Sequence, residues 1–299
     1  MQNQAATGDK DWNILKLLQW TTSYFKSRGI ENPRAGAEIL LASVLQLERV
    51  ELYVRHDLPL SAEELGRFKE MIRRRAAGEP VAYIVGRREF WSMDFAVTPA
   101  VLIPRPETEC LVEAALQRLE KNAAHGQRVL ELGTGCGAVI LVLAAQAPQH
   151  EFFASDASAA ALGVARNNAC THGLEENVRF VCGNWLDPVH NRSARFDMIL
   201  SNPPYIRRSL IDHLQVEIRR FEPLAALDGG EDGLRCLEKI IDAAAGCLRA
   251  GGHLLLEIGH DQKEAVAAMI ERAGGYEDVT FLQDYGGHDR VASMRRQIK

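Results

Sequence analysis

The amino-acid sequence predicts an α/β protein in which a small all-helical domain precedes a doubly wound, mostly parallel sheet. From about residue 128 onward, short apolar segments alternate with helical segments, and this alternation requires a parallel sheet covered by helices on both faces. Residues 11–77 show helical periodicity alone. The last two apolar segments are joined by a link too short for a crossover helix, so we expect an antiparallel hairpin at the end of the sheet.

The helical domain is expected to cover residues 1–80. An apolar stripe at helical spacing joins Trp12, Leu15 and Leu18 to residues 20–25. Asn32-Pro33 indicates an N-cap followed by proline at the first helical position, and it opens a second helix that is expected to end at residue 47.

A further helix and a linker complete the region before the sheet. Ser61 and Glu64 form a capping box ahead of an apolar helical face. Gly78-Glu79-Pro80 then breaks the helical pattern. Residues 83–86 and 89–97 have the composition of two short strands, so we expect a β-hairpin linker over residues 81–105.

The α/β domain is expected to cover residues 106–299. Its strands are predicted at residues 128–132, 150–155, 177–182, 196–200, 252–258, 276–282 and 290–294, with helices at 107–119, 137–147, 158–171 and 233–249.

The charge, the apolar runs and the cysteine spacing of the chain limit the classes of protein to which it can belong. The 299 residues carry a formal net charge of −5, which disfavours broad binding to a nucleic-acid backbone. No apolar run approaches the roughly 20 residues of a membrane span, and the first residues lack the features of a secretory signal. The six cysteines show no metal-ligand spacing, so we expect reduced thiols, no metal and a cytoplasmic protein.

A glycine-rich turn follows the first predicted strand of the sheet. Gly133-Thr134-Gly135-Cys136-Gly137 joins that strand to a helix, and glycines there let a ligand approach the backbone closely. Asp156 ends the next strand, where an acidic side chain can accept both hydroxyls of a ribose. Strand, turn, helix and acidic residue in this order predict a nucleoside site.

A second motif follows a later strand. Asn202-Pro203-Pro204-Tyr205 comes directly after the apolar segment 196–201. The two prolines stiffen the turn and remove two backbone donors, which leaves a carboxamide and a phenol at the carboxyl end of a strand.

The glycine turn alone does not identify the nucleoside. Gly133, Gly135 and Ala138 satisfy the dinucleotide pattern, so NAD is one candidate. S-adenosylmethionine would use the same turn and Asp156, and the terminal hairpin and the asparagine turn favour it. Trp185 follows the third strand and is expected either to cover the adenine or to pack in the core.

Together these motifs resemble the class I S-adenosylmethionine-dependent methyltransferases that modify planar amide or amino nitrogens, which implies a seven-stranded sheet. More narrowly, the chain resembles the peptide chain release factor N5-glutamine methyltransferase family over about residues 34–295. The segments that carry this narrower resemblance are Ala82-Tyr83-Ile84-Val85-Gly86, Glu89-Phe90-Trp91, residues 101–109 with Ile103-Pro104-Arg105-Pro106-Glu107-Thr108, residues 221–227, and residues 284–291.

The resemblance implies methyl transfer from S-adenosylmethionine to the side-chain amide nitrogen of the glutamine in the Gly-Gly-Gln loop of class-1 release factors. S-adenosylhomocysteine is the implied product. The Asn202 oxygen and the Pro203 carbonyl would accept the two amide hydrogens, and no general base is needed because a protonated N-methyl amide is strongly acidic. The implied cofactor residues are Gly133, Thr134, Gly135, Cys136, Gly137, Asp156, Ala157, Trp185, Leu186 and Asn202, and the implied catalytic and substrate residues are Asn202, Pro203, Pro204, Tyr205, Arg105 and Thr108.

Three other functions stay open at this point. A glutamine methyltransferase of a ribosomal protein would share the asparagine turn, and an adenine-N6 methyltransferase would present a similar amine to Asn202. An NAD-dependent oxidoreductase would leave the Pro-Pro turn unexplained. We expect a monomer that docks its protein substrate through the helical domain, without direct contact to nucleic acid or membrane.

Overall fold

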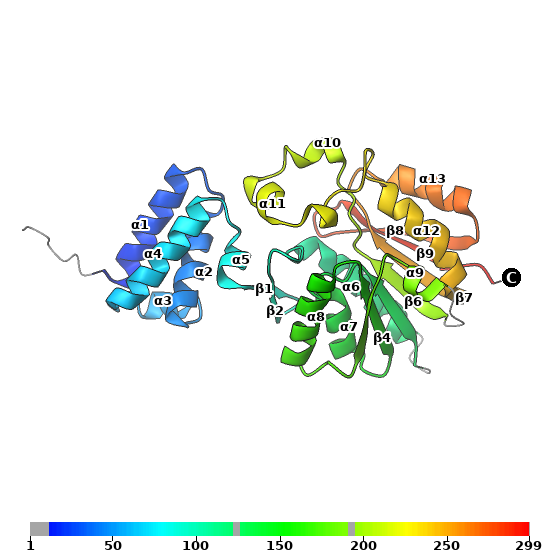
Figure 1. Ribbon diagram of the computed structural model, residues 1–299, viewed down its shortest axis with the longest axis horizontal. Coiled ribbons are helices and arrows are strands. Elements are labelled where there is room, and N and C mark those ends of the chain that lie inside the picture. The colour runs from blue at the N-terminus through cyan, green and yellow to red at the C-terminus, as the bar shows by residue number, and fades with distance from the viewer. Residues whose placement is uncertain (1–11, 122–125, 191–194, 299) are drawn as a thin grey trace, which may run out of the picture. The chain divides into compact units, whose positions relative to one another are not determined.

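The computed structural model describes residues 12–121, 126–190 and 195–298. The described chain forms two compact units that divide between Val85 and Gly86 (Figure 1). Each unit has its own hydrophobic core.

The first unit is entirely helical within the described residues, as the sequence predicts. Its core is built from apolar side chains of α1, α2 and α4, with Phe25, Leu40 and Phe68 among the most buried. Burial of such a set is the main source of stability for a unit of this size. The helices are α1 (Ile14–Ser27), α2 (Pro33–Leu45), α3 (Glu51–Val54), α4 (Ala62–Ala76) and α5 (Val81–Val85).

Of the two helix N-caps predicted from the sequence, one forms as expected and one differs. The predicted capping box at Ser61 and Glu64 is confirmed, with both reciprocal hydrogen bonds present. Asn32 precedes Pro33 at the start of α2 as expected, but it adopts a left-handed conformation and its side chain makes no capping bond. In α1 the buried face contains Ile14, Leu17 and Leu18, while Leu15 and Trp20 of the expected stripe are 38% and 49% exposed.

The hairpin that precedes the sheet is shorter than predicted. Residues 83–86 were expected to be extended, but residues 81–85 form the helix α5. The backbone amides of Tyr83 and Ile84 both donate to the Pro80 carbonyl, which starts this helical turn. The strands β1 (Arg87–Phe90) and β2 (Met93–Ala96) then pair antiparallel in a separate two-stranded sheet.

The second unit contains the predicted seven-stranded sheet, with strand order β5-β4-β3-β6-β7-β9-β8. Strands β3 to β7 pair parallel, and β9 pairs antiparallel with both β7 and β8, so the expected terminal hairpin is confirmed. The strands are β3 (Arg128–Leu132), β4 (Glu151–Asp156), β5 (Val178–Cys182), β6 (Phe196–Ser201), β7 (Leu248–Glu257), β8 (Tyr276–Gln283) and β9 (Asp289–Arg296).

Helices cover both faces of this sheet, so the predicted doubly wound α/β fold is confirmed (Figure 1). Leu130, Leu132, Leu254 and Leu256 pack on one face against α12 and α13. The helix α6 lies beside α7, and α8 lies against β4 and β5. The helices are α6 (Glu109–Lys121), α7 (Ala138–Gln146), α8 (Ala159–Thr171), α9 (Asp187–His190), α10 (Arg208–Ile211), α11 (Val216–Phe221), α12 (Arg235–Cys247) and α13 (Lys263–Ala273), with 3-10 turns η1 (Pro106–Thr108) and η2 (Leu224–Ala226).

The strand order reverses between β3 and β6. From β3 the chain proceeds outward to β4 and β5, whereas from β6 it proceeds in the other direction to β7. Open α/β sheets bind ligands in the crevice that such a reversal leaves at the carboxyl ends of the strands. Both motifs from the sequence lie there, because the glycine turn follows β3 and the asparagine turn follows β6.

Candidate active site

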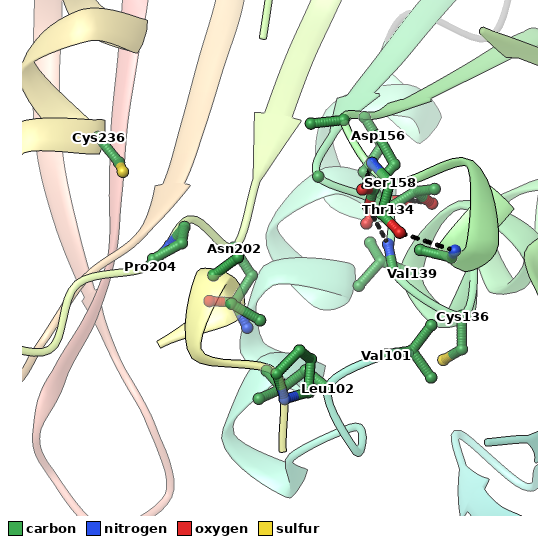
Figure 2. A pocket seen from close by; sticks show the side chains of 18 of the residues that line it. Val101, Leu102, Thr134, Cys136, Val139, Asp156, Ser158, Asn202, Pro204 and Cys236 are labelled. Carbon is green, nitrogen blue, oxygen red and sulfur yellow. Dashed lines mark hydrogen bonds between the residues drawn. The ribbon is translucent and has the colours of Figure 1, made fainter. Parts of the chain in front are cut away.

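A cavity of about 710 Å³ opens at this edge of the sheet. That volume lies within the roughly 300–1,000 Å³ of small-molecule sites. Figure 2 shows Asp156 and Thr134 on one side of it and Asn202 and Pro204 on the other, with Leu102 below them in this view. The predicted site residues that line the cavity are Arg105, Thr108, Gly133, Thr134, Gly135, Cys136, Asp156, Ala157, Trp185, Asn202 and Pro204.

The glycine turn forms one wall. Gly133 and Gly135 have φ values of +69° and +57°, in the left-handed region that strongly favours glycine. No atom lies within 4 Å of the position that a Cβ on Gly135 would occupy, so a ligand can approach this backbone. A Cβ on Gly133 would meet the Trp185 ring at 3.7 Å, so the ring packs over the start of the turn.

Asp156 is held rigidly beside the turn. Its Oδ2 accepts a hydrogen bond from the Gly135 amide at 2.9 Å, and its Oδ1 accepts one from the Ser158 amide at 2.8 Å. A carboxylate has about four acceptor positions, so both oxygens keep capacity for further donors. This geometry suits a vicinal diol.

Glu131 lies beneath the turn and is fully buried. Its Oε2 accepts hydrogen bonds from the Thr134 hydroxyl at 2.5 Å and from the Ile140 amide at 3.2 Å. Burial raises the pKa of Glu131 to about 8, although these two donors partly offset the effect. A cationic ligand bound in the cavity would favour the ionised form of this carboxyl, which lies in the cavity wall.

The asparagine turn forms the opposite wall. The Asn202 Nδ2 donates to Thr108 Oγ1 at 3.1 Å, so the amide of Asn202 is anchored to η1. Ser201 precedes it and donates its hydroxyl to the Leu132 carbonyl at 2.8 Å, which ties the ends of β6 and β3 together. In the described part of the chain, no backbone hydrogen bond uses the Pro203 carbonyl.

Two glycines of a segment distant in sequence, Gly229 and Gly233, let the backbone pack closely against the asparagine turn. A Cβ on Gly229 would lie 2.8 Å from the Tyr205 Cα, and one on Gly233 would lie 2.4 Å from the Tyr205 carbonyl oxygen. The buried Gln262 donates to the same Tyr205 carbonyl at 3.0 Å and to the Gly233 carbonyl at 3.2 Å. The turn is therefore fixed by contacts to three separate parts of the unit.

Arg105 joins two segments at the cavity. It forms an ion pair of 2.5 Å with Glu222, whose side chain is 1% exposed. The second oxygen of Glu222 accepts from the Ile103 amide at 3.3 Å. The pair connects the segment before η1 to the segment after α11, and both contribute residues to the cavity wall.

Four predicted site residues lie outside the set that lines the cavity. Gly137 caps α7, and a Cβ there would lie 3.1 Å from Leu141 Cδ1 and 3.3 Å from Ala165 Cβ, so glycine serves helix packing. Leu186 is 2% exposed in the core, and Pro203 is buried. Tyr205 packs against the core and donates its hydroxyl to Glu257, because a buried phenol requires an acceptor.

Several site residues were missed by sequence reasoning. Glu131 is part of the strand that leads into the glycine turn, and its position within an apolar run was a usable signal of a buried acid. Glu222, Glu257 and Gln262 had no local signal, since their partners lie far away in the chain. The structure also places Arg235, Cys236 and Lys239 of α12 at the cavity.

The fold and this cavity together define a class of protein: a methyltransferase with an added helical domain. Residues 109–219 match the family model described as methyltransferase small domain, and residues 16–86 match the one described as PrmC N-terminal domain. This result favours methyl transfer over the NAD-dependent alternative.

Comparison with known proteins identifies the family. A release factor glutamine methyltransferase of Geobacter sulfurreducens is 43% identical over 284 residues, which cover 95% of this chain and 97% of the relative. One from Xylella fastidiosa is 46% identical over 263 residues, with 88% and 93% covered, and one from Rhodopirellula baltica is 36% identical over 292 residues, with 97% and 98% covered. The chain belongs to the release factor glutamine methyltransferase family, and the resemblance found in its sequence is confirmed.

Solved structures agree on the fold. The catalytic domain of hMettl16 in complex with MAT2A 3′UTR hairpin 6 aligns with a TM-score of 0.55 and 16% identity, covering 77% of this chain and 82% of that one. A methyltransferase from Pyrococcus furiosus aligns with a TM-score of 0.51 and 20% identity, covering 77% and 98%.

The described residues show neither a membrane-spanning helix nor a metal-binding cluster. None of the helices found there has the length and apolar character to cross a membrane. The same residues contain no cluster of three or more His, Cys, Asp or Glu side chains that could hold a metal ion.

Proposed function

We propose that this enzyme transfers the methyl group of S-adenosylmethionine to the side-chain amide nitrogen of the glutamine in the Gly-Gly-Gln loop of class-1 release factors. The observation that carries the proposal is the meeting of the glycine turn with Asp156 and the Asn202 turn in one cavity. The first wall suits a nucleoside and the second suits a primary amide.

The residues present fit S-adenosylmethionine. Asp156 would accept hydrogen bonds from the ribose hydroxyls, the open backbone at Gly135 would admit the donor, and Trp185 would cover the adenine. The positive charge of the donor would favour ionisation of Glu131, which lies beneath the turn. When bound, S-adenosylmethionine supplies an electrophilic methyl group on its sulfonium.

The asparagine turn would present the acceptor. An amide nitrogen is a weak nucleophile, because its lone pair is delocalised into the carbonyl, so orientation is the main contribution that the protein can make. Asn202 Oδ1 and the Pro203 carbonyl would accept the two amide hydrogens. Each bond strengthens as the nitrogen becomes positive, since a hydrogen bond to a charged group contributes roughly 1.5–3 kcal/mol. Holding near-attack geometry can contribute about 7–11 kcal/mol to lowering the barrier.

The protein substrate requires a second contact. A glutamine that reaches into this cavity arrives on a flexible loop, and one loop buries less than the roughly 1,200 Å² of a specific complex. We propose that the helical unit supplies this contact. Removal of residues 1–77 should then raise KM for an intact release factor while cofactor affinity stays within a few-fold.

Incubation with labelled S-adenosylmethionine and a purified release factor tests the assignment. Mass spectrometry should locate one added methyl group on the glutamine of the Gly-Gly-Gln loop, and a factor with asparagine at that position should stay unlabelled. Label on a ribosomal protein or on adenine, with none on the release factor, would replace this assignment by one of the alternatives.

A further inference from the structure

The asparagine turn has few hydrogen bonds of its own to hold its shape. Pro203 and Pro204 lack backbone N–H groups, and within the described ranges no backbone-to-backbone hydrogen bond outside the helices and strands involves residues 202–204. The path of this backbone therefore depends on what holds the two ends of the turn. Ser201 at one end belongs to β6, whereas Tyr205 at the other end lies outside any helix or strand.

The buried side chain of Gln262 holds the Tyr205 end. Its Nε2 donates to the Tyr205 carbonyl at 3.0 Å and to the Gly233 carbonyl at 3.2 Å. Its Oε1 accepts from the Gly259 amide at 2.8 Å. A flipped carboxamide would place an oxygen against two carbonyls and an N–H against an N–H, so the surroundings of Gln262 fix its orientation. One of its two donors is thereby committed to the asparagine turn.

The side chain of Gln262 does not serve the helix that it precedes. Gln262 occupies the N-cap position of α13, but its side chain makes no capping hydrogen bond there. Shorter residues such as serine or aspartate cap helices better than a long amide side chain does. The contact with the asparagine turn, rather than helix capping, therefore accounts for a glutamine at this position.

Close packing leaves the Tyr205 end little room to move. A Cβ on Gly229 would lie 2.8 Å from the Tyr205 Cα. A Cβ on Gly233 would lie 2.8 Å from Gln262 Nε2 and would clash with the Tyr205 carbonyl oxygen. The phenol is held as well, because its hydroxyl donates to the buried Glu257 at 3.1 Å. Both the backbone and the side chain of Tyr205 are thus attached to other segments of the unit.

We propose that Gln262 is a positioning residue: by holding the Tyr205 carbonyl, it sets the position of the two oxygens that accept the substrate amide. This inference rests on the proposed function, in which Asn202 and Pro203 supply those oxygens. Prolines fix φ at both positions between Asn202 and Tyr205, so a shift of Tyr205 is passed on to Asn202. A misplacement of about 1 Å can lower turnover about 100-fold, so a contact that touches no reacting atom can still limit the rate.

Gln262→Met tests the contact, because methionine has a similar length but no hydrogen-bond donor. At saturating cofactor and release factor, kcat should fall about 10- to 100-fold, while S-adenosylhomocysteine affinity stays within a few-fold by isothermal titration. Ile270→Ala is the control for lost stability, since Ile270 is a buried core residue of the same helix, and its kcat should stay near the wild-type value. Equal losses of kcat in the two variants, or a loss of cofactor affinity in Gln262→Met as large as its loss of kcat, would overturn the proposal.

Gly233→Ala displaces the same carbonyl with Gln262 unchanged, so it provides the test if Gln262→Met does not fold. The added Cβ would clash with the Tyr205 carbonyl oxygen, and kcat should fall about 10-fold or more. Gly173→Ala is the matched control. Gly233 and Gly173 have φ values of +79° and +66°, so a Cβ strains both, but no atom lies within 4 Å of the Cβ position on Gly173. The same kcat in both alanine variants would contradict the role of the Tyr205 carbonyl and overturn the proposal.

A measurement without release factor separates this proposal from the proposed function. The side-chain NH₂ signals of Asn202, assigned in ¹⁵N-asparagine-labelled protein by their loss in Asn202→Ala, report on the turn, because this NH₂ group is hydrogen-bonded within the site. They should shift in Gln262→Met and Gly233→Ala, and they should stay in place in Ile270→Ala and Gly173→Ala. Unchanged signals in the first two variants refute the role of Gln262, whereas the expected shifts in an enzyme that methylates no release factor refute only the proposed function.

Discussion

The buried carboxyl of Glu131 should make the stability of the protein fall as pH rises. Its pKa in the folded state is about 8, against an ordinary value of 4.5. Because the folded protein keeps this proton to a higher pH than the unfolded chain, the stabilisation is complete below about 4.5 and is lost as pH rises through about 8. Desolvation is the main cause, and the negative charge of Asp156 adds to it.

The expected loss of stability follows from the difference between the folded and the ordinary pKa of Glu131. A gap of about 3.5 pH units at roughly 1.36 kcal/mol per unit amounts to about 5 kcal/mol at the alkaline end. That is a large part of the roughly 5–15 kcal/mol that stabilises a typical domain. Glu131→Gln removes the titration and keeps an oxygen for the Thr134 hydroxyl and the Ile140 amide, so it should remove the same pH dependence.

Urea unfolding between pH 5 and 8.5 measures the effect in the absence of cofactor. Replacing Trp12 and Trp20 by phenylalanine leaves fluorescence from Trp91 and Trp185, which both belong to the second unit. The quantity to compare is the difference in free energy of unfolding between the wild type and Glu131→Gln. Burial lowers the pKa of His150, which makes the stability of both proteins rise with pH, and the difference removes this contribution.

Glu264→Gln, which changes an exposed side chain on α13, serves as the matched control and should follow the wild type. Parallel curves for wild type and Glu131→Gln across this range of pH would refute the reasoning, since the carboxyl would then be charged in the folded state.

The other predictions concern the site and its supports. Asp156→Asn should weaken S-adenosylhomocysteine binding at least tenfold by isothermal titration, because two charge-assisted hydrogen bonds lose their charge; equal affinity would remove Asp156 from the cofactor site. Asn202→Ala should lower kcat by about 100-fold or more with cofactor affinity within a few-fold, so a kcat near the wild-type value would contradict the clamp. Arg105→Ala should destabilise the second unit by about 3–5 kcal/mol, because Glu222 is left buried without its partner, and adding Glu222→Leu should recover part of the loss in urea unfolding; no recovery would mean that the buried charge is not the cause.

Much of the fold was predictable because its rules act over short distances along the chain. The alternation of strand and helix after residue 128, the link before β9 and the capping box at Ser61 each depend on neighbouring residues, and each was confirmed. The glycine turn and Asp156 were recognisable for the same reason, since positive φ values and strand ends leave a local pattern. The error at residues 83–85 shows the limit, because an apolar run of that length suits a strand or a helix equally well.

Only the tertiary structure decided what supports the site. Thr108 and Asn202 meet although η1 and β6 are far apart in sequence, and the same is true of Arg105 with Glu222 and of Tyr205 with Glu257. A buried charge or hydroxyl needs a partner, but sequence spacing does not say which segment will provide it. By itself the sequence determined the class of fold, the two motifs and the family. The topology determined their partners, because the strand reversal between β3 and β6 brings distant segments to one edge of the sheet.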